Sequence, residues 1–137
     1  MSCGRATHPK IFVVDDDEAV RDAIKGLLEM RGLEVADFES TADFVSGYAK
    51  PDHGCLILDQ HLPRVSGLEF LASREGRDLG IPVILITGQG NASIARRAQQ
   101  VGAEYLEKPI RRQTLIETVE RVIAGRCLRL PDTRCLG

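Results

Sequence analysis

Five polar residues of chemically useful types lie at the ends of four of the five strands that we expect in this chain. Asp15 and Asp16 follow the first strand, a lone Asp59 follows the third, Thr87 the fourth and Lys108 the fifth. Short, wholly apolar runs are typical of strands buried on both faces of a parallel sheet. The carboxyl ends of parallel strands meet at one edge, where open α/β sheets bind ligands. We therefore expect these side chains to converge.

Three carboxylates in one crevice predict either a shared proton or a bound cation. At an effective dielectric constant near 20, each pair about 4 Å apart repels by about 4 kcal/mol. Three such pairs would rival the roughly 5–15 kcal/mol that stabilises a domain. Oxygen ligands with few protein contacts suit Mg²⁺, which keeps several waters and shares phosphate oxygens. Lys108 would add a positive charge that meets a phosphoryl oxygen or a carboxylate, and Thr87 would add a hydroxyl.

The chemistry that fits this set is phosphoryl transfer to a carboxylate. An aspartate can act as a nucleophile and carry an aspartyl-phosphate, while a metal ion and a lysine neutralise charge on the transferring group. Asp59 is the best nucleophile candidate, because it is single and follows the central apolar run. Asp15 and Asp16 form the pair better suited to holding a metal ion.

The elements that must position these residues alternate between strand and helix patterns. We predict strands at 10–14, 33–38, 55–58, 83–86 and 104–107. Helical patterns follow each strand, with the later four at about 40–49, 66–74, 92–101 and 111–124. Such alternation predicts a single doubly wound α/β domain, a parallel sheet covered on both faces with right-handed crossovers.

The bulk composition restricts the class of protein. A chain of 137 residues with a net charge of -2 gives one domain and no electrostatic case for direct nucleic-acid binding. No apolar run is long enough for a membrane span, and the start of the chain lacks a signal-peptide core. Four cysteines without metal-ligand spacing favour a reduced, cytoplasmic location. We expect a leader at 1–9, the domain at 10–124, and a tail at 125–137 too short for an effector domain.

Four motifs in this order resemble the receiver domain of two-component response regulators. They are Val13-Val14-Asp15-Asp16, Leu58-Asp59 with Pro63 and Gly67, Ile86-Thr87-Gly88, and Lys108-Pro109. The last two are closest in style to receivers that precede LuxR-type DNA-binding domains. The resemblance covers 10–124 and implies a flavodoxin-like sheet of order 2-1-3-4-5, in which the first and third strands are neighbours.

The resemblance also implies a role for each site residue. Asp59 would accept a phosphoryl group from the phosphohistidine of a sensor histidine kinase. Asp15 and Asp16 would bind Mg²⁺ together with Asp59 and the backbone carbonyl of His61. Lys108 would contact the phosphoryl group. Such a receiver is not an enzyme in the usual sense, since it catalyses only its own phosphorylation and dephosphorylation.

Further implied features concern the switch. Thr87 would move toward the phosphoryl group, Tyr105 would change rotamer in step, and Lys108-Pro109 would be a cis peptide. The output would be a changed partner or homodimer surface. Two faces are candidates: the helix at 92–101 with the strand at 104–107 and the last helix, or the first and last helices. Four arginines on the last two helices give a basic surface, either solvated or used by a partner: Arg96, Arg97, Arg111 and Arg112.

Departures from the family pattern are mild. Leu62 stands where Met is usual, a near-isosteric exchange. Gln60, His61 and Gln89 occupy variable rim positions that would tune the lifetime of the phosphate, in a direction the sequence does not give. The His61 side chain is more readily read as solvated than as a metal ligand.

Two other functions fit part of the pattern. Asp15-Asp16-Asp17 matches the Asp-x-Asp of haloacid-dehalogenase-type phosphatases, in which Asp15 would be the nucleophile. Against this, Ala19 stands where Thr or Val is expected, no acidic pair follows Lys108, and Asp59 would have no task. A receiver-like interaction domain that never uses phosphate is the second alternative, although all the acceptor residues are present.

Overall fold

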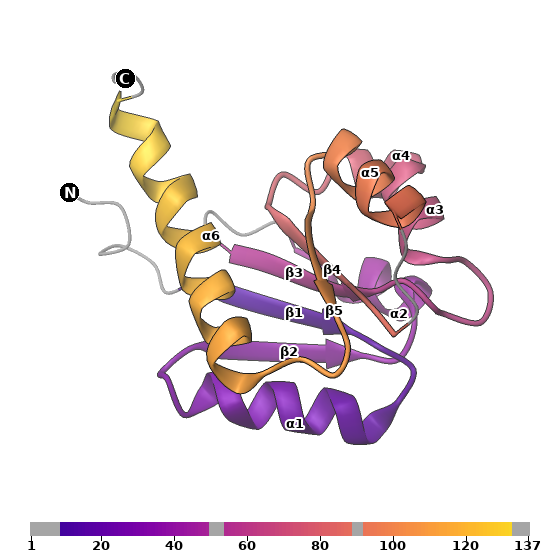
Figure 1. The fold of residues 1–137 in the computed structure, drawn as a ribbon, viewed down its shortest axis with the longest axis horizontal. Coiled ribbons are helices and arrows are strands. Elements are labelled where there is room, and N and C mark those ends of the chain that lie inside the picture. Colours follow the sequence, from indigo (N-terminus) through magenta and orange to yellow (C-terminus); the bar gives the residue numbers. More distant parts are fainter. Residues whose placement is uncertain (1–8, 50–53, 89–91, 133–137) are drawn as a thin grey trace.

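Five parallel strands form the centre of the molecule. A computed structural model describes residues 9–49, 54–88 and 92–132 (Figure 1). The strands are β1 (Lys10–Val14), β2 (Glu34–Phe38), β3 (Gly54–Asp59), β4 (Val83–Thr87) and β5 (Glu104–Glu107). They pair in the order β2-β1-β3-β4-β5, and each pair is parallel. The predicted fold class and strand order are confirmed.

Helices cover both faces of this sheet (Figure 1). They are α1 (Glu18–Glu29), α2 (Thr41–Gly47), α3 (Gly67–Ala72), α4 (Arg74–Arg77), α5 (Ala92–Gln100) and α6 (Arg112–Asp132). Successive strand residues point to opposite faces, so Phe12 and Val14 of β1 pack in the layer with α2, α3 and α5. Ile11 and Val13 pack in the layer with α1 and α6. The sheet is therefore buried on both sides.

The helix predicted at about 66–74 is instead two short helices. Ser66 caps the first, and its hydroxyl accepts from the Glu69 amide in a capping box. Ser73 then adopts an extended conformation, with its hydroxyl accepting from the Gly76 amide to begin α4. The Gly76 backbone lies so close to Phe70 that a Cβ there would stand 2.1 Å from the Phe70 carbonyl oxygen. The prediction of one continuous helix was wrong because Ser73 satisfies both helix ends.

The last helix is longer than predicted. We expected it to end near Ala124, with a tail from Gly125, but α6 continues to Asp132. A glycine costs about 1 kcal/mol in a helix relative to alanine and does not by itself end one. In Figure 1 the final turns of α6 project beyond the sheet.

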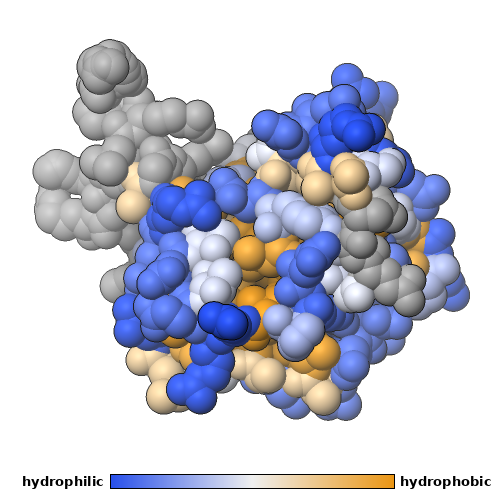
Figure 2. All heavy atoms as spheres, viewed as in Figure 1, coloured by the Kyte–Doolittle hydropathy of each residue, from blue (hydrophilic) through white to orange (hydrophobic). Residues whose placement is uncertain are grey.

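The surface over α6 and β5 is mainly hydrophilic. Figure 2 shows a strip of hydrophobic side chains between these two elements, surrounded by polar ones. Within the described part of the chain, we find no helix with the length and apolarity to span a bilayer.

Candidate functional site

The neighbouring strands β1 and β3 place two carboxylates side by side. Val14 lies opposite Leu58 in the sheet, so the residues that follow them, Asp15 and Asp59, are adjacent where the two strands end. The backbone of Asp15 is held on both sides. Its amide donates to the Phe38 carbonyl at 3.1 Å, and its own carbonyl accepts from Nη1 of Arg21 at 2.7 Å.

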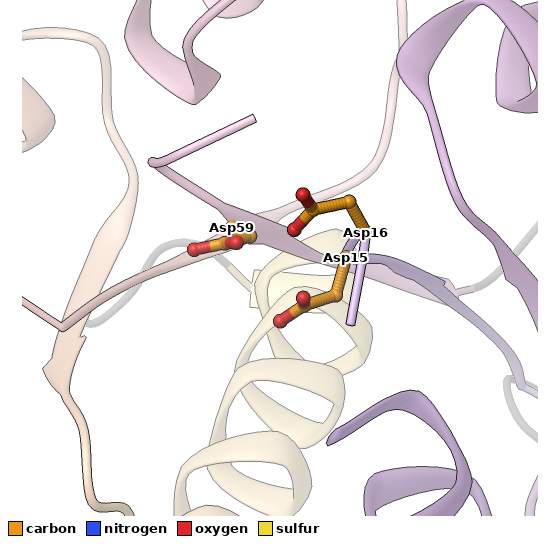
Figure 3. Close-up of side chains that lie close together, drawn as sticks. All are labelled: Asp15, Asp16 and Asp59. Carbon is orange, nitrogen blue, oxygen red and sulfur yellow. The ribbon is translucent and has the colours of Figure 1, made fainter. Parts of the chain in front are cut away.

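Three carboxylates meet at this edge. Asp15, Asp16 and Asp59 each offer an oxygen within 4.8 Å of the others. Figure 3 shows the three side chains gathered between the ends of β1 and β3. Asp15 and Asp59 are 2% and 4% exposed, whereas Asp16 is open to solvent. Hard oxygen donors with one open side are the set that a small divalent cation uses, so these residues could hold a metal ion.

Lys108 brings the positive charge to this cluster. Its Nζ lies 3.2 Å from Oδ2 of Asp15 and 3.6 Å from Oδ1 of Asp59. The Lys108 amide donates to the carbonyl of Thr87, which fixes the lysine beside β4. The bond from Lys108 to Pro109 is cis, as predicted.

The charges of the cluster shift the pKa of two of its members. Burial raises the pKa of Asp59, and the charge of Asp15 raises it further, while Lys108 acts in the opposite sense. For Lys108, burial lowers the pKa, but the carboxylates of Asp59 and Asp15 outweigh it and the pKa is raised. The lysine is thus held protonated beside a carboxylate whose charge is costly.

Thr87, the last residue of β4, is fully buried next to the cluster. Its Oγ1 lies 2.6 Å from Nε2 of His61. The imidazole is exposed, and its ring also reaches across from the loop after β3 to bond Thr87, a contact that the sequence did not predict. The His61 amide also donates to Oδ1 of Asp59, at 3.3 Å. Tyr105 is half-buried, and its hydroxyl donates to Glu107 at 3.1 Å.

Two supporting residues were not found from the sequence. We expected Gln60 at the rim, but it is buried, and its Oε1 accepts from the Leu68 amide at the start of α3. Arg21, read only as part of a helix, bonds the Asp15 carbonyl and pairs with Asp37 at 3.0 Å. The one available signal for Gln60 was a polar residue directly after a buried strand. Gln89 lies outside the described residues.

The structure thus brings together Asp15, Asp16, Asp59 and Lys108, with Thr87 next to them. Such a cluster can bind a cation and neutralise a group that carries negative charge near Asp59. The basic surface predicted on α5 and α6 is exposed, and its members form none of the ion pairs found among the described residues: Arg96, Arg97, Arg111 and Arg112.

The fold and this pocket define a doubly wound α/β protein with an acidic site at its topological switch point. The family model of the response regulator receiver domain matches residues 11–120. The chain belongs to this family, whose members act as phosphoacceptors in signalling. The phosphatase alternative that used Asp15 is not favoured.

Known relatives and structures agree with this assignment. The chain is 36% identical over 115 residues to the transcriptional regulatory protein TdiR of Thauera aromatica, covering 83% of this chain and 51% of TdiR. It is 38% identical over 117 residues to FixJ of Azorhizobium caulinodans, covering 85% of this chain and 55% of FixJ. The structure of the response regulator StyR superposes with a TM-score of 0.80 at 35% identity, covering 90% of this chain and 63% of StyR. The chain spans about half the length of these two curated relatives.

Proposed function

We propose that Asp59 is the phosphoacceptor of this receiver. The observation that carries the proposal is how differently the two buried carboxylates are held. Asp15 accepts from the Asp17 amide at 2.9 Å and from Lys108 at 3.2 Å. Among the described residues, the polar contacts of the Asp59 carboxylate are longer, 3.3 Å to the His61 amide and 3.6 Å to Nζ of Lys108. Asp59 is therefore the carboxylate freer to attack.

Charge balance supports Mg²⁺ as the cofactor. Three carboxylates against one ammonium leave two negative charges uncompensated, which a divalent cation would neutralise. Asp15, Asp16 and Asp59 would hold it, together with the backbone carbonyl of His61. When bound, Mg²⁺ would supply positive charge to the oxygens of the transferring phosphoryl group. Lys108 would hold another of these oxygens with its ammonium group.

The proposed donor is the phosphohistidine of a sensor histidine kinase. The phosphorus–nitrogen bond of the donor breaks as a carboxylate oxygen of Asp59 bonds to phosphorus, and the histidine regains its lone pair. Hydrolysis of the aspartyl-phosphate by water returns Asp59 and inorganic phosphate. Both steps act on the chain itself, so the receiver would be a switch rather than an enzyme for other substrates. We expect this exchange in the cytoplasm.

An apolar groove beside the pocket suits the approach of such a donor. The groove, of about 830 Å³, lies between α1 and the segment that leads into α6, and Lys108 lines it as well as the carboxylate cluster. A protein that delivers phosphate to Asp59 would therefore also cover this groove. The residues of α1 and its C-cap that line it are Ala19, Val20, Ala23, Ile24, Leu27 and Met30.

Phosphorylation would be read out through Thr87 and Tyr105. Thr87 and Leu85 point to the same face of β4, and Tyr105 of the edge strand β5 pairs with Leu85, so Thr87 and Tyr105 lie on the same face of the sheet. A move of Thr87 toward the phosphoryl group would free space for Tyr105 to change rotamer. This change would alter the face of α5, β5 and α6, where the unpaired arginines lie, and we propose this face, or that of α1 and α6, for a homodimer.

Labelling with radioactive acetyl phosphate and Mg²⁺ tests the acceptor. We expect the wild-type protein and an Asp22→Asn control, which changes an exposed carboxylate of α1, to take up label. Asp59→Asn should take up none. Label retained by Asp59→Asn and lost on Asp15→Asn would refute the proposal and restore the phosphatase reading. A wild-type protein that never takes label would favour the interaction domain without phosphate.

A further inference from the structure

The contact between His61 and Thr87 joins the loop after β3 to the end of β4. His61 is exposed on the loop after β3, whereas Thr87 is 0% exposed at the end of β4. Nε2 of the imidazole and Oγ1 of the threonine are 2.6 Å apart, a short hydrogen bond. The only solvent-facing member of the pair is therefore the histidine ring.

The position of His61 is fixed from its other side as well. Its amide donates to Oδ1 of Asp59, so the loop turns back over the acceptor carboxylate. From this turn the ring extends to Thr87 rather than into the carboxylate cluster. The imidazole thus holds the Thr87 hydroxyl in its present position at the end of β4.

We propose that His61 is a positioning residue, a latch that keeps the Thr87 hydroxyl in its resting place and so opposes activation. This inference rests on the proposed function, in which that hydroxyl moves to the phosphoryl group. In this movement Oγ1 of Thr87 leaves Nε2 of His61, so the bond to His61 breaks. The latch therefore stabilises the resting state and lowers the population of the active one.

The size of the effect follows from the strength of one hydrogen bond. Such a bond shifts a two-state equilibrium by about 2- to 12-fold. A ligand that binds only the active state gains apparent affinity by up to the same factor when the latch is removed. A solvated histidine with no role in the switch would leave that affinity unchanged.

The test measures the affinity for beryllofluoride, a phosphoryl analogue, in the presence of Mg²⁺. Binding is followed by NMR through the Thr87 methyl group and the Tyr105 ring. We expect His61→Ala to bind about 2- to 12-fold more tightly than the wild type. The Thr87 methyl shift of the unliganded variant should also move toward its beryllofluoride-bound value. Arg64→Ala, an exposed change in the same loop, should leave both readouts unchanged.

Threonine variants separate the latch from an indirect effect. In a Thr87→Ser background the hydroxyl remains, and the His61→Ala gain should persist. In a Thr87→Val background the hydroxyl is absent, and the gain should vanish. A His61→Ala protein with unchanged or weaker affinity, or with the same gain in Thr87→Val, would overturn the latch. Failure of the wild type to bind beryllofluoride would instead refute the proposed function.

Discussion

Replacing Asp59 by asparagine should stabilise the protein in the absence of metal. Asp59 and Asp15 offer oxygens within 4.8 Å of each other, which corresponds to a repulsion of about 3.5 kcal/mol at an effective dielectric constant near 20. Lys108, at 3.6 Å, offsets this by about 4.6 kcal/mol on the same scale. The repulsion from Asp15 and the attraction to Lys108 nearly cancel. What remains is the free-energy cost of burying the charged carboxylate of Asp59. After relaxation we expect Asp59→Asn to gain about 1–3 kcal/mol.

The stability that Asp59→Asn gains over the wild type should increase as pH rises from 4 toward neutral. The pKa of Asp59 is raised in the folded state. Between the ordinary pKa of an aspartate, about 3.9, and this raised value, the folded state binds more protons than the unfolded state. The stability of the wild-type protein therefore falls as pH rises through that window. Lys108, with its raised pKa, stays protonated throughout, so the advantage of Asp59→Asn should be largest at neutral pH and shrink as pH falls toward 4.

Chemical denaturation in EDTA at several pH values measures this difference. A gain of about 1 kcal/mol corresponds to a rise in melting temperature of about 3–4 °C for a domain of this size. Added Mg²⁺ should reduce this advantage, because it binds the intact cluster better than the cluster of Asp59→Asn. At ten times its dissociation constant, the ion stabilises the folded state by about 1.4 kcal/mol. A metal-free Asp59→Asn protein less stable than the wild type at neutral pH would refute the electrostatic reasoning.

Three further predictions concern the surroundings of the pocket. Gln60→Ala should cost about 1–3 kcal/mol in urea denaturation, because the buried Leu68 amide loses its acceptor; an unchanged midpoint would contradict it. Gly67→Ala should cost about 1–3 kcal/mol in the same assay, since its Cβ would lie 2.8 Å from the Asp59 carbonyl oxygen. A variant as stable as the wild type would contradict this, because it would mean that the backbone after β3 shifts at no cost. Ala23→Glu, in the apolar groove, should slow phosphotransfer from a kinase about tenfold while labelling by acetyl phosphate is kept; equal slowing of both would place the effect in the pocket.

The convergence of the site residues could be predicted from the sequence because it depends only on topology. Short predicted strands followed by Asp15, Asp59 and Lys108 are sufficient once the strands are parallel, since every strand then ends at the same edge. The strand order came from the family resemblance rather than from these residues. It nevertheless decides that β1 and β3 are neighbours, and hence that the two buried carboxylates touch the same lysine.

The features at Ser73, Gln60 and His61 that the sequence did not predict share a different physical origin. Each depends on where a polar side chain points after folding, which periodicity does not encode. Ser73 divides a helix because its hydroxyl accepts from an amide three residues on. Gln60 is buried because an amide of α3 needs an acceptor, and His61 is bonded because Thr87 lies within reach across the sheet edge.

The site can therefore be divided into residues that any chain with this strand pattern would share and a contact that is particular to this chain. The carboxylates and Lys108 follow from the strand ends, so any chain with this pattern would carry them. The hydrogen bond between His61 and Thr87 instead joins a loop residue to a partner 26 positions away in the sequence. A bond of that kind changes an equilibrium without changing the chemistry, because it acts on one state of Thr87 and not on the acceptor itself. The rate and extent of switching in this receiver are therefore expected to depend on its loop side chains, while its capacity to accept a phosphoryl group depends on the sheet edge.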